Sequence, residues 1–108
     1  MEGERILTWG LVFLVLCHNL GCLWFLVGEL VEEGWVERYD YGNSPKGEQY
    51  LAAVYFIVTT ITTVGYGDIT GSGGSAGEQG FCIVLMLIGV ISYSMAISSF
   101  MSAISASN

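Results

Sequence analysis

The stretch Thr59-Thr60-Ile61-Thr62-Thr63-Val64-Gly65-Tyr66-Gly67-Asp68 decides how this chain of 108 residues is organised. It completes an apolar segment, residues 50–64, that is too short to cross a hydrocarbon layer of ~30 Å as a helix. From Thr59 onward most of the residues are β-branched, which weakens helical preference. We therefore expect a short helix over residues 50–62 that passes into extended chain over residues 63–67.

Two long uncharged apolar runs, residues 6–27 and 81–104, flank this segment. At 1.5 Å rise per residue they would form helices of about 33 and 36 Å, enough to span the ~30 Å hydrocarbon layer. The first run is longer than the ~7–15 residue core of a signal peptide and no A-x-A site follows it, which favours a retained span. The short segment between the spans is then a candidate re-entrant element, tolerated at membrane depth where protein or water surrounds it.

The charge of the chain is low in amount and strongly acidic in balance. Only 12% of residues are charged, against about 25% in a typical soluble domain, and 53% are hydrophobic. Ten acids against three bases exclude a nucleic-acid partner, whose phosphates require a Lys/Arg surface. Residues 28–49 carry most of the acids, whereas residues 68–80 are rich in Gly and Ser and read as a flexible return loop.

The glycines Gly65, Gly67 and Gly71 also allow an enzyme interpretation, because they are spaced like a dinucleotide-binding loop. That fold needs an acid about 20 residues further on to bind a ribose hydroxyl, and no charged residue follows Glu78. The helix after the glycines would also be apolar on every side. The sequence therefore disfavours a dinucleotide-binding enzyme.

Cys17, His18 and Cys22 raise the possibility of a metal site. Their spacing does not place all three on one helix face, and no fourth ligand lies nearby. We interpret the cysteines as small apolar residues of a span. His18 is interpreted as a hydrogen-bonding residue that packs the first helix on its neighbours.

The sequence TVGYGD at residues 63–68, placed between two spans, resembles the pore of potassium channels over nearly the whole chain. The resemblance implies an all-α membrane protein with two transmembrane helices, a re-entrant pore helix and an extended selectivity filter in a tetrameric pore. It implies passive, potassium-selective conduction through a homotetramer, with no catalysed reaction. It assigns the parts as outer helix 6–27, acidic outer loop 28–49, pore helix 50–62, filter 63–67, return loop 68–80 and inner helix 81–104.

The filter of this family replaces the hydration shell of potassium with backbone carbonyls. Carbonyls of successive residues can face one axis when the chain alternates between right- and left-handed backbone, and glycine adopts positive φ at little steric cost. The implied filter residues are Thr63, Val64, Gly65, Tyr66 and Gly67, with potassium held at the first four. The implied partners are membrane lipid, further copies of the chain and permeant potassium ions, with no cofactor.

Residues around the filter are implied to support it, namely Asp68, Tyr55, Phe56, Thr59 and Thr62. Asp68 would brace the filter from just outside, with Tyr55 as its hypothesised partner. The C-terminus of the pore helix carries partial negative charge and would favour a cation in the cavity beneath the filter. Phe56 cannot donate a hydrogen bond, so we expect a loosely held Tyr66 and slow inactivation of the filter.

A narrower resemblance is to ether-à-go-go-type and cyclic-nucleotide-binding-domain channels. Residues 18–24, His-Asn-Leu-Gly-Cys-Leu-Trp, are similar to the H-W-x-x-C-x-W pattern of that group, with Asn19 in place of the first Trp. Tyr55-Phe56 and Leu87-Ile88-Gly89 followed by Tyr93 are also similar to it. This resemblance suggests Gly89 as a gating hinge, with close helix packing as an equal alternative.

Two stripes at about helical spacing compete to line the cavity and lower gate. The resemblance favours the first of them, and helix packing is the alternative for both. They are Gly89, Tyr93, Ile97 and Met101, and Ser94, Ser98, Ser102 and Ser105.

The wider biology is expected from the resemblance. The chain would be the pore module of a longer gated channel in the plasma membrane, with cytoplasmic termini. The outer segment would then carry a net charge of −6 per chain and concentrate cations at the mouth, or serve only as a solvated loop. A weakly selective cation pore and a non-conducting assembly or regulatory subunit remain the alternatives.

Overall fold

Four helices make up most of the chain in a computed structural model that describes residues 2–31, 33–71 and 75–107. They are α1 (Glu2–Leu30), α2 (Trp35–Arg38), α3 (Lys46–Ile61) and α4 (Ala76–Ser107). Within those ranges the chain forms no β-strand. The predicted all-α fold with two membrane-spanning helices is confirmed.

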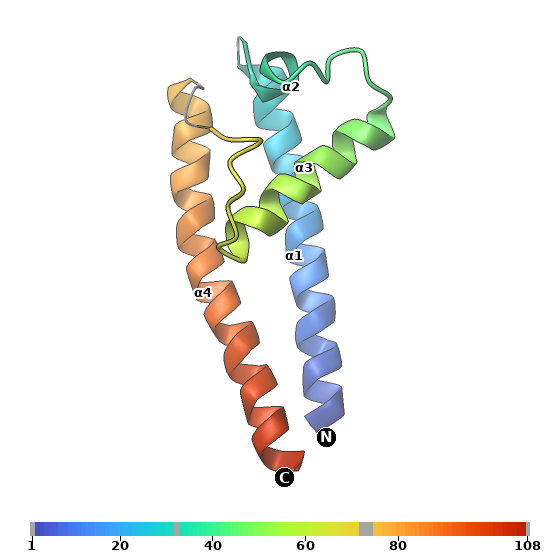
Figure 1. The fold of residues 1–108 in the computed structure, drawn as a ribbon, viewed down its shortest axis with the longest axis vertical. Coiled ribbons are helices and arrows are strands. Elements are labelled where there is room, and N and C mark those ends of the chain that lie inside the picture. Colours follow the sequence, from blue (N-terminus) through green and yellow to red (C-terminus); the bar gives the residue numbers. More distant parts are fainter. Residues whose placement is uncertain (1, 32, 72–74, 108) are drawn as a thin grey trace.

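The long helices α1 and α4 lie side by side and run in opposite directions, so that both termini lie at one end of the molecule (Figure 1). They contain 29 and 32 residues, which corresponds to about 44 and 48 Å. Each therefore continues beyond the expected spans 6–27 and 81–104. Only 22% and 17% of their most apolar stretches are buried within the chain. Helices that expose so much apolar surface require lipid or other chains around them.

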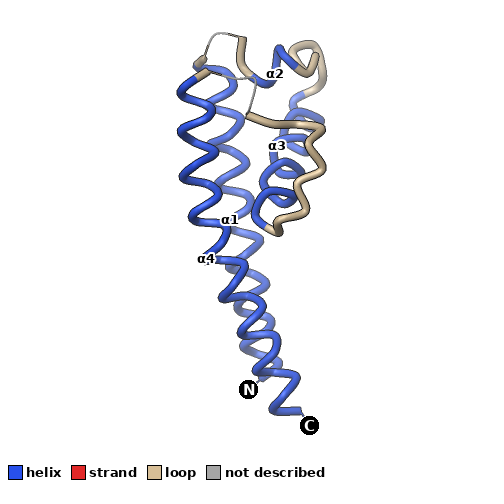
Figure 2. The backbone as a smooth tube through the Cα atoms, turned by 60° about the vertical axis from the view of Figure 1, so that its left-hand side comes forward, coloured by secondary structure: helices blue, strands red, loops and turns tan. Residues whose placement is uncertain are grey.

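Helix α3 crosses α1 obliquely and ends near the middle of the long axis of the molecule (Figures 1 and 2). It begins at Lys46 rather than at residue 50, because Pro45 occupies the N-cap and its carbonyl accepts the amides of Glu48 and Gln49 at 3.0 and 3.1 Å. It ends at Ile61, within the β-branched run. Helix α4 begins at Ala76, earlier than residue 81, which shortens the connection that follows α3.

An aromatic stack joins all four helices in the half of the molecule that contains the loops. The Trp24 side chain of α1 is 0% exposed, and its ring centroid lies 4.4 Å from that of Phe56, 5.7 Å from that of Trp35 and 5.6 Å from that of Phe81. The Trp35 indole also donates a hydrogen bond to the Trp24 carbonyl at 2.9 Å. In the other half α1 and α4 form an apolar cleft of about 260 Å³. The half of the molecule that contains the loops is therefore packed around an aromatic core, whereas, among the described residues, the half that contains the two termini consists of α1 and α4.

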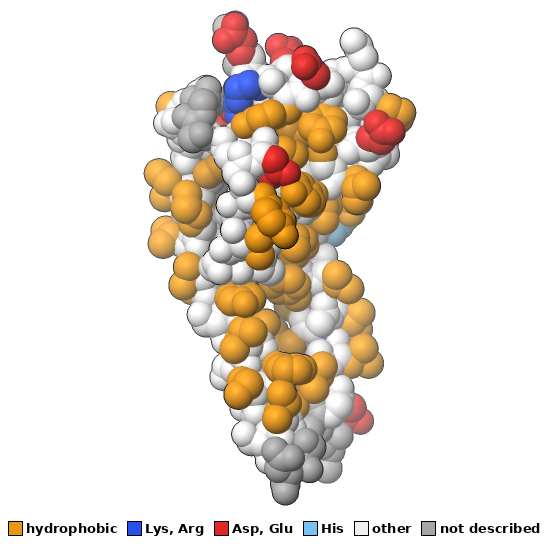
Figure 3. All heavy atoms as spheres, in the orientation of Figure 1, with side chains coloured by type: hydrophobic (Ala, Val, Ile, Leu, Met, Phe, Trp, Pro, Cys, Tyr) orange, Lys and Arg blue, Asp and Glu red, His pale blue; other side chains and the backbone are white. Residues whose placement is uncertain are grey.

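Acidic side chains gather at the α2 end, and apolar side chains cover much of the body below it (Figure 3). This division is expected for a protein whose body faces lipid and whose loops face water. Glu32 and residues 72–74 of the return loop lie outside the described residues.

Candidate functional site

The filter segment, residues 63–67, runs from the end of α3 back toward the α2 end of the molecule (Figure 1). Its backbone is left-handed at alternate positions, with φ of 66° at Thr63, 54° at Gly65 and 83° at Gly67, while Val64 and Tyr66 keep negative φ. A positive φ at a β-branched residue such as Thr63 is uncommon and costs about 1–3 kcal/mol. Left-handed and right-handed backbone therefore alternate along the segment. This alternation turns successive carbonyls to one side of the chain, whereas in a regular strand they point to alternate sides.

Backbone hydrogen bonds attach the inner half of this segment to the last turn of α3. The Gly65 amide donates to the Thr59 carbonyl at 3.0 Å, and the Thr63 amide donates to the Thr60 carbonyl at 3.2 Å. Carbonyls at a helix C-terminus have no partner within the helix, so they are free to accept these bonds. Thr59 thus contacts the filter segment through its main chain, a contact that side-chain reasoning does not reveal.

The threonine hydroxyls at the same helix end bond to their own helix. Those of Thr59 and Thr60 donate to the Phe56 carbonyl at 3.0 and 2.7 Å, and that of Thr62 donates to the Val58 carbonyl at 2.6 Å. Such back-bonding satisfies the hydroxyls locally. The Thr59 and Thr62 hydroxyls therefore bond within α3, and of these two predicted support residues Thr59 contacts the filter segment, through its carbonyl.

Tyr55 and Asp68 meet at the outer end of the segment. The Tyr55 hydroxyl donates to Oδ2 of Asp68 at 2.6 Å, and Oδ1 accepts the Ile69 amide at 3.1 Å. The hydrogen bond from Tyr55 lowers the pKa of Asp68 below its ordinary value. Asp68 is therefore held as a carboxylate beside the exit of the segment.

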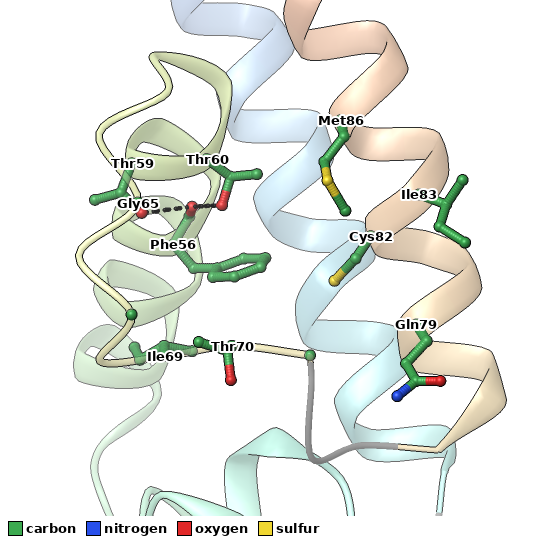
Figure 4. Close-up of a pocket in the computed structure, with 12 residues that line it drawn as sticks. Phe56, Thr59, Thr60, Gly65, Ile69, Thr70, Gln79, Cys82, Ile83 and Met86 are labelled. Carbon is green, nitrogen blue, oxygen red and sulfur yellow. Dashed lines mark hydrogen bonds between the residues drawn. The ribbon is translucent and has the colours of Figure 1, made fainter.

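A mainly apolar cavity of about 460 Å³ separates the filter segment from α4 (Figure 4). Phe56 lines it from α3, and Cys82 and Met86 line it from α4. Phe56 is buried and stacks on Trp24, whereas the Tyr66 side chain is 73% exposed. Phe56 therefore packs α3 against α1 within the core of the chain, whereas the Tyr66 side chain lies outside that core.

The predicted gating stripe is divided in the structure. Gly89 packs against α3 so closely that a Cβ there would lie 3.1 Å from Cα of Ile61. Tyr93 lines the apolar cleft between α1 and α4, while Ile97 and Met101 are exposed. Because positions four apart drift by about 40° around a helix, the four residues do not share one face. The competing serines 94, 98, 102 and 105 are exposed.

His18 connects α1 to α3, since its Nδ1 lies 2.6 Å from the Tyr50 hydroxyl. Its Nε2 lies 3.8 Å from the thiol of Cys22. Over the residues that the structure describes, no group of three or more His, Cys, Asp and Glu side chains could hold a metal ion. The arrangement matches the interpretation of His18 as a helix-packing residue.

A partly buried ion pair at the α2 end was not foreseen from the sequence. Arg38 lies 2.8 Å from Glu78, whose side chain is 0% exposed, although 40 positions separate them along the chain. Acidic residues are common in the first turn of a helix because they interact favourably with the helix dipole. The position of Glu78 therefore gave no indication in the sequence that it pairs with an arginine.

Comparisons with known proteins agree with this geometry. A family model described as an ion channel matches residues 5–106. The mouse voltage-gated delayed rectifier potassium channel KCNH8 is 28% identical over 105 aligned positions, which cover 78% of this chain and 9% of that protein. The mouse voltage-gated inwardly rectifying potassium channel KCNH7 is 30% identical over 100 positions, which cover 76% and 8%. No solved structure matches the chain.

The chain spans about a tenth of the length of these relatives. The predicted resemblance to a potassium-channel pore of the ether-à-go-go type is confirmed, and the dinucleotide-binding enzyme is set aside. A match over nearly all of the sequence, together with two apolar spans, makes this an integral membrane protein. The chain belongs to the ion channel family.

Proposed function

We propose that four copies of the chain form a potassium-selective pore that conducts passively across a membrane. Potassium ions bind at the carbonyls of Thr63, Val64, Gly65 and Tyr66, which replace the hydration shell of the ion. One chain supplies one strand of oxygens, so a closed ring around an ion needs several copies. The relatives are named as potassium channels, which supports potassium as the permeant ion. The proposal requires no cofactor.

The observation that carries the proposal is the alternating backbone of the filter segment. Positive φ at Thr63, Gly65 and Gly67 is the conformation that a row of carbonyls on one side requires. Strain at Thr63 is unfavourable for folding alone and is typical of functional sites.

Two further features support a cation pore built from several copies of the chain. Helix α3 ends near the middle of the long axis, so its partial negative charge is placed at membrane depth (Figure 1). Val64 and Tyr66 are exposed at 53% and 73%, which leaves apolar surface for neighbouring copies to cover.

We further propose that the α2 end faces the exterior of the plasma membrane and that both termini are cytoplasmic. Both termini lie at one end, opposite the acidic loops (Figures 1 and 3). In this orientation Glu33, Glu37, Asp40 and Asp68 would attract cations to the outer mouth. This electrostatic attraction of cations weakens as ionic strength rises.

Potassium flux into proteoliposomes tests the proposal, with Gly67→Ala as the diagnostic variant. Within one chain a Cβ at Gly67 meets no atom within 4 Å, but φ is 83°, so the substitution strains the backbone without a clash inside the subunit. Gly42→Ala is the matched control, because its surroundings are equally open and it has no positive φ. We expect barium-sensitive flux in the wild type and in Gly42→Ala. In Gly67→Ala we expect about five- to thirtyfold less, since a left-handed L-residue costs roughly 1–2 kcal/mol.

The alternatives give different results in the same vesicles. A bi-ionic reversal potential near zero for potassium against sodium would indicate a weakly selective cation pore. Wild-type tetramers with no barium-sensitive flux would indicate a non-conducting subunit and would refute the proposal.

A further inference from the structure

Three segments far apart in the sequence meet at one buried carboxylate near the outer mouth. Glu78, in the first turn of α4, is 0% exposed. Its Oε2 accepts the Trp35 amide at the start of α2 at 2.7 Å, and its Oε1 accepts Nη1 of Arg38 at 2.8 Å. The outer loop is therefore attached to the beginning of α4 by charge-assisted hydrogen bonds, which are roughly twice as strong as neutral ones.

The same arginine also holds the chain just beyond the filter segment. Nη2 of Arg38 donates to the Thr70 carbonyl at 2.8 Å, and Nη1 donates to the Glu33 carbonyl at 3.2 Å. Tyr39 completes the contact, because its hydroxyl accepts the Thr70 amide at 3.1 Å. Thr70 thus has its carbonyl and its amide bonded to neighbouring residues of α2 and its C-cap, three positions after Gly67.

We propose that Arg38 is a positioning residue that fixes the outer end of the selectivity filter by linking α2, Thr70 and α4. The inference rests on the proposed potassium pore and adds to it a residue of the outer loop. The inner half of the filter segment is bonded to α3 through Thr63 and Gly65, so an independent anchor at Thr70 fixes the opposite end. Strained backbone persists only where its surroundings hold it in place.

The chemistry of the guanidinium suits this link better than an ammonium. Its planar fork bonds Glu78 and Thr70 through two nitrogens held at a fixed separation, whereas a lysine has a single nitrogen. Burial by itself lowers the pKa of Arg38, but the hydrogen bond and charge of Glu78 raise it to a net increase. Arg38 is therefore cationic throughout the physiological range.

A second ion pair of the outer segment provides a matched control. Lys46 lies 3.7 Å from Glu29, and these side chains are 79% and 45% exposed. Exposed pairs of this kind contribute little. Lys46→Gln removes a whole positive charge from the same end of the molecule without touching Thr70, so it changes the charge there more than Arg38→Lys, which keeps its cation.

The experiment records potassium currents from wild type, Arg38→Lys and Lys46→Gln in planar bilayers at low and high external potassium. Arg38→Lys keeps a cation beside Glu78, so tetramer assembly and midpoint of thermal dissociation should stay close to wild type. Its conductance at low external potassium should decay at least about tenfold faster, the effect of losing one charged hydrogen bond. High external potassium should restore it, because ions bound in the filter stabilise the conducting form. Lys46→Gln should behave as wild type.

The outcomes separate this inference from the proposed pore. A wild-type tetramer without potassium current refutes the proposed function itself. Current in wild type with identical decay in Arg38→Lys overturns the role of Arg38. If Arg38→Lys does not assemble, Tyr39→Phe is measured instead, since it removes the acceptor of the Thr70 amide and leaves the Arg38–Glu78 pair intact. Faster current decay of Tyr39→Phe at low potassium supports the anchor at Thr70. Decay at the wild-type rate overturns it.

Discussion

Gly89→Ala tests whether this glycine serves close packing or hinge bending. Gly89 lies in the interior of α4 and faces the last residue of α3. An added Cβ would lie 3.1 Å from Cα of Ile61 and 3.4 Å from its Cγ1. Because the nearest atom is main chain, a different rotamer of Ile61 cannot relieve the contact. The end of α3 must instead move by a few tenths of an ångström, directly below the filter segment.

Two effects of opposite sign determine the change in stability. Replacing glycine by alanine in a helix interior gains about 1 kcal/mol. Forcing extra volume into a packed contact costs about 1–3 kcal/mol. The net change in the free energy of tetramer dissociation should therefore lie between zero and about 2 kcal/mol of destabilisation.

Gly80→Ala on the same helix is the control, because a Cβ there meets nothing within 4 Å. It should stabilise the tetramer by up to about 1 kcal/mol. Thermal dissociation of purified tetramers measures both variants against wild type, and bi-ionic reversal potentials measure potassium selectivity. We expect Gly89→Ala to be about 1–3 kcal/mol less stable than Gly80→Ala and to lose selectivity, because the end of α3 is displaced.

Gly89 does not serve close packing if Gly89→Ala is as stable as Gly80→Ala and keeps wild-type selectivity. A lower open probability with unchanged selectivity and stability would instead show that Gly89 acts as a hinge.

Three other predictions concern the core, the filter exit and the outer mouth. Trp24→Ala removes the centre of the aromatic stack and should destabilise the tetramer by about 3–5 kcal/mol in thermal dissociation. Trp24→Phe should be intermediate between Trp24→Ala and wild type. If Trp24→Ala and Trp24→Phe are equally stable, the stack does not support the loops. The Tyr55 hydrogen bond depresses the pKa of Asp68, so its stabilisation is present above pH 3.8 and is lost only as pH falls through the lower folded value. Carboxyl NMR should show this pKa rising in Tyr55→Phe, and conduction should not change down to about pH 5 through this group. Neutralising Glu33 and Glu37 with glutamine should lower single-channel conductance at low ionic strength and leave it unchanged at high salt; an equal reduction at both would contradict a long-range field.

Local patterns made the spans and the filter segment predictable. An uncharged apolar run longer than the hydrocarbon layer can be recognised without knowledge of its neighbours. Glycines at alternate positions likewise indicate a backbone that must enter positive φ, as Gly65 and Gly67 do. The bounds of the helices were less accurate, because Pro45 starts α3 upstream of its apolar run and polar turns extend both spans.

The sequence could not predict which groups support the filter segment. Thr59 bonds to Gly65 through its carbonyl, which is a property of the backbone path and not of the residue type. Positive φ at Thr63 was equally hidden, because threonine rarely adopts it and no side-chain pattern signals it.

The sequence by itself determined that this is an all-α membrane protein of potassium-channel type, because hydropathy, length and the TVGYGD motif are properties of contiguous residues. Only the tertiary structure decided that Arg38 bonds to Glu78 and Thr70, that Trp24 stacks on Phe56, and that Gly89 lies against Ile61. The physical reason is that these contacts join positions 28 to 40 residues apart, and they form only when the helices and loops pack together.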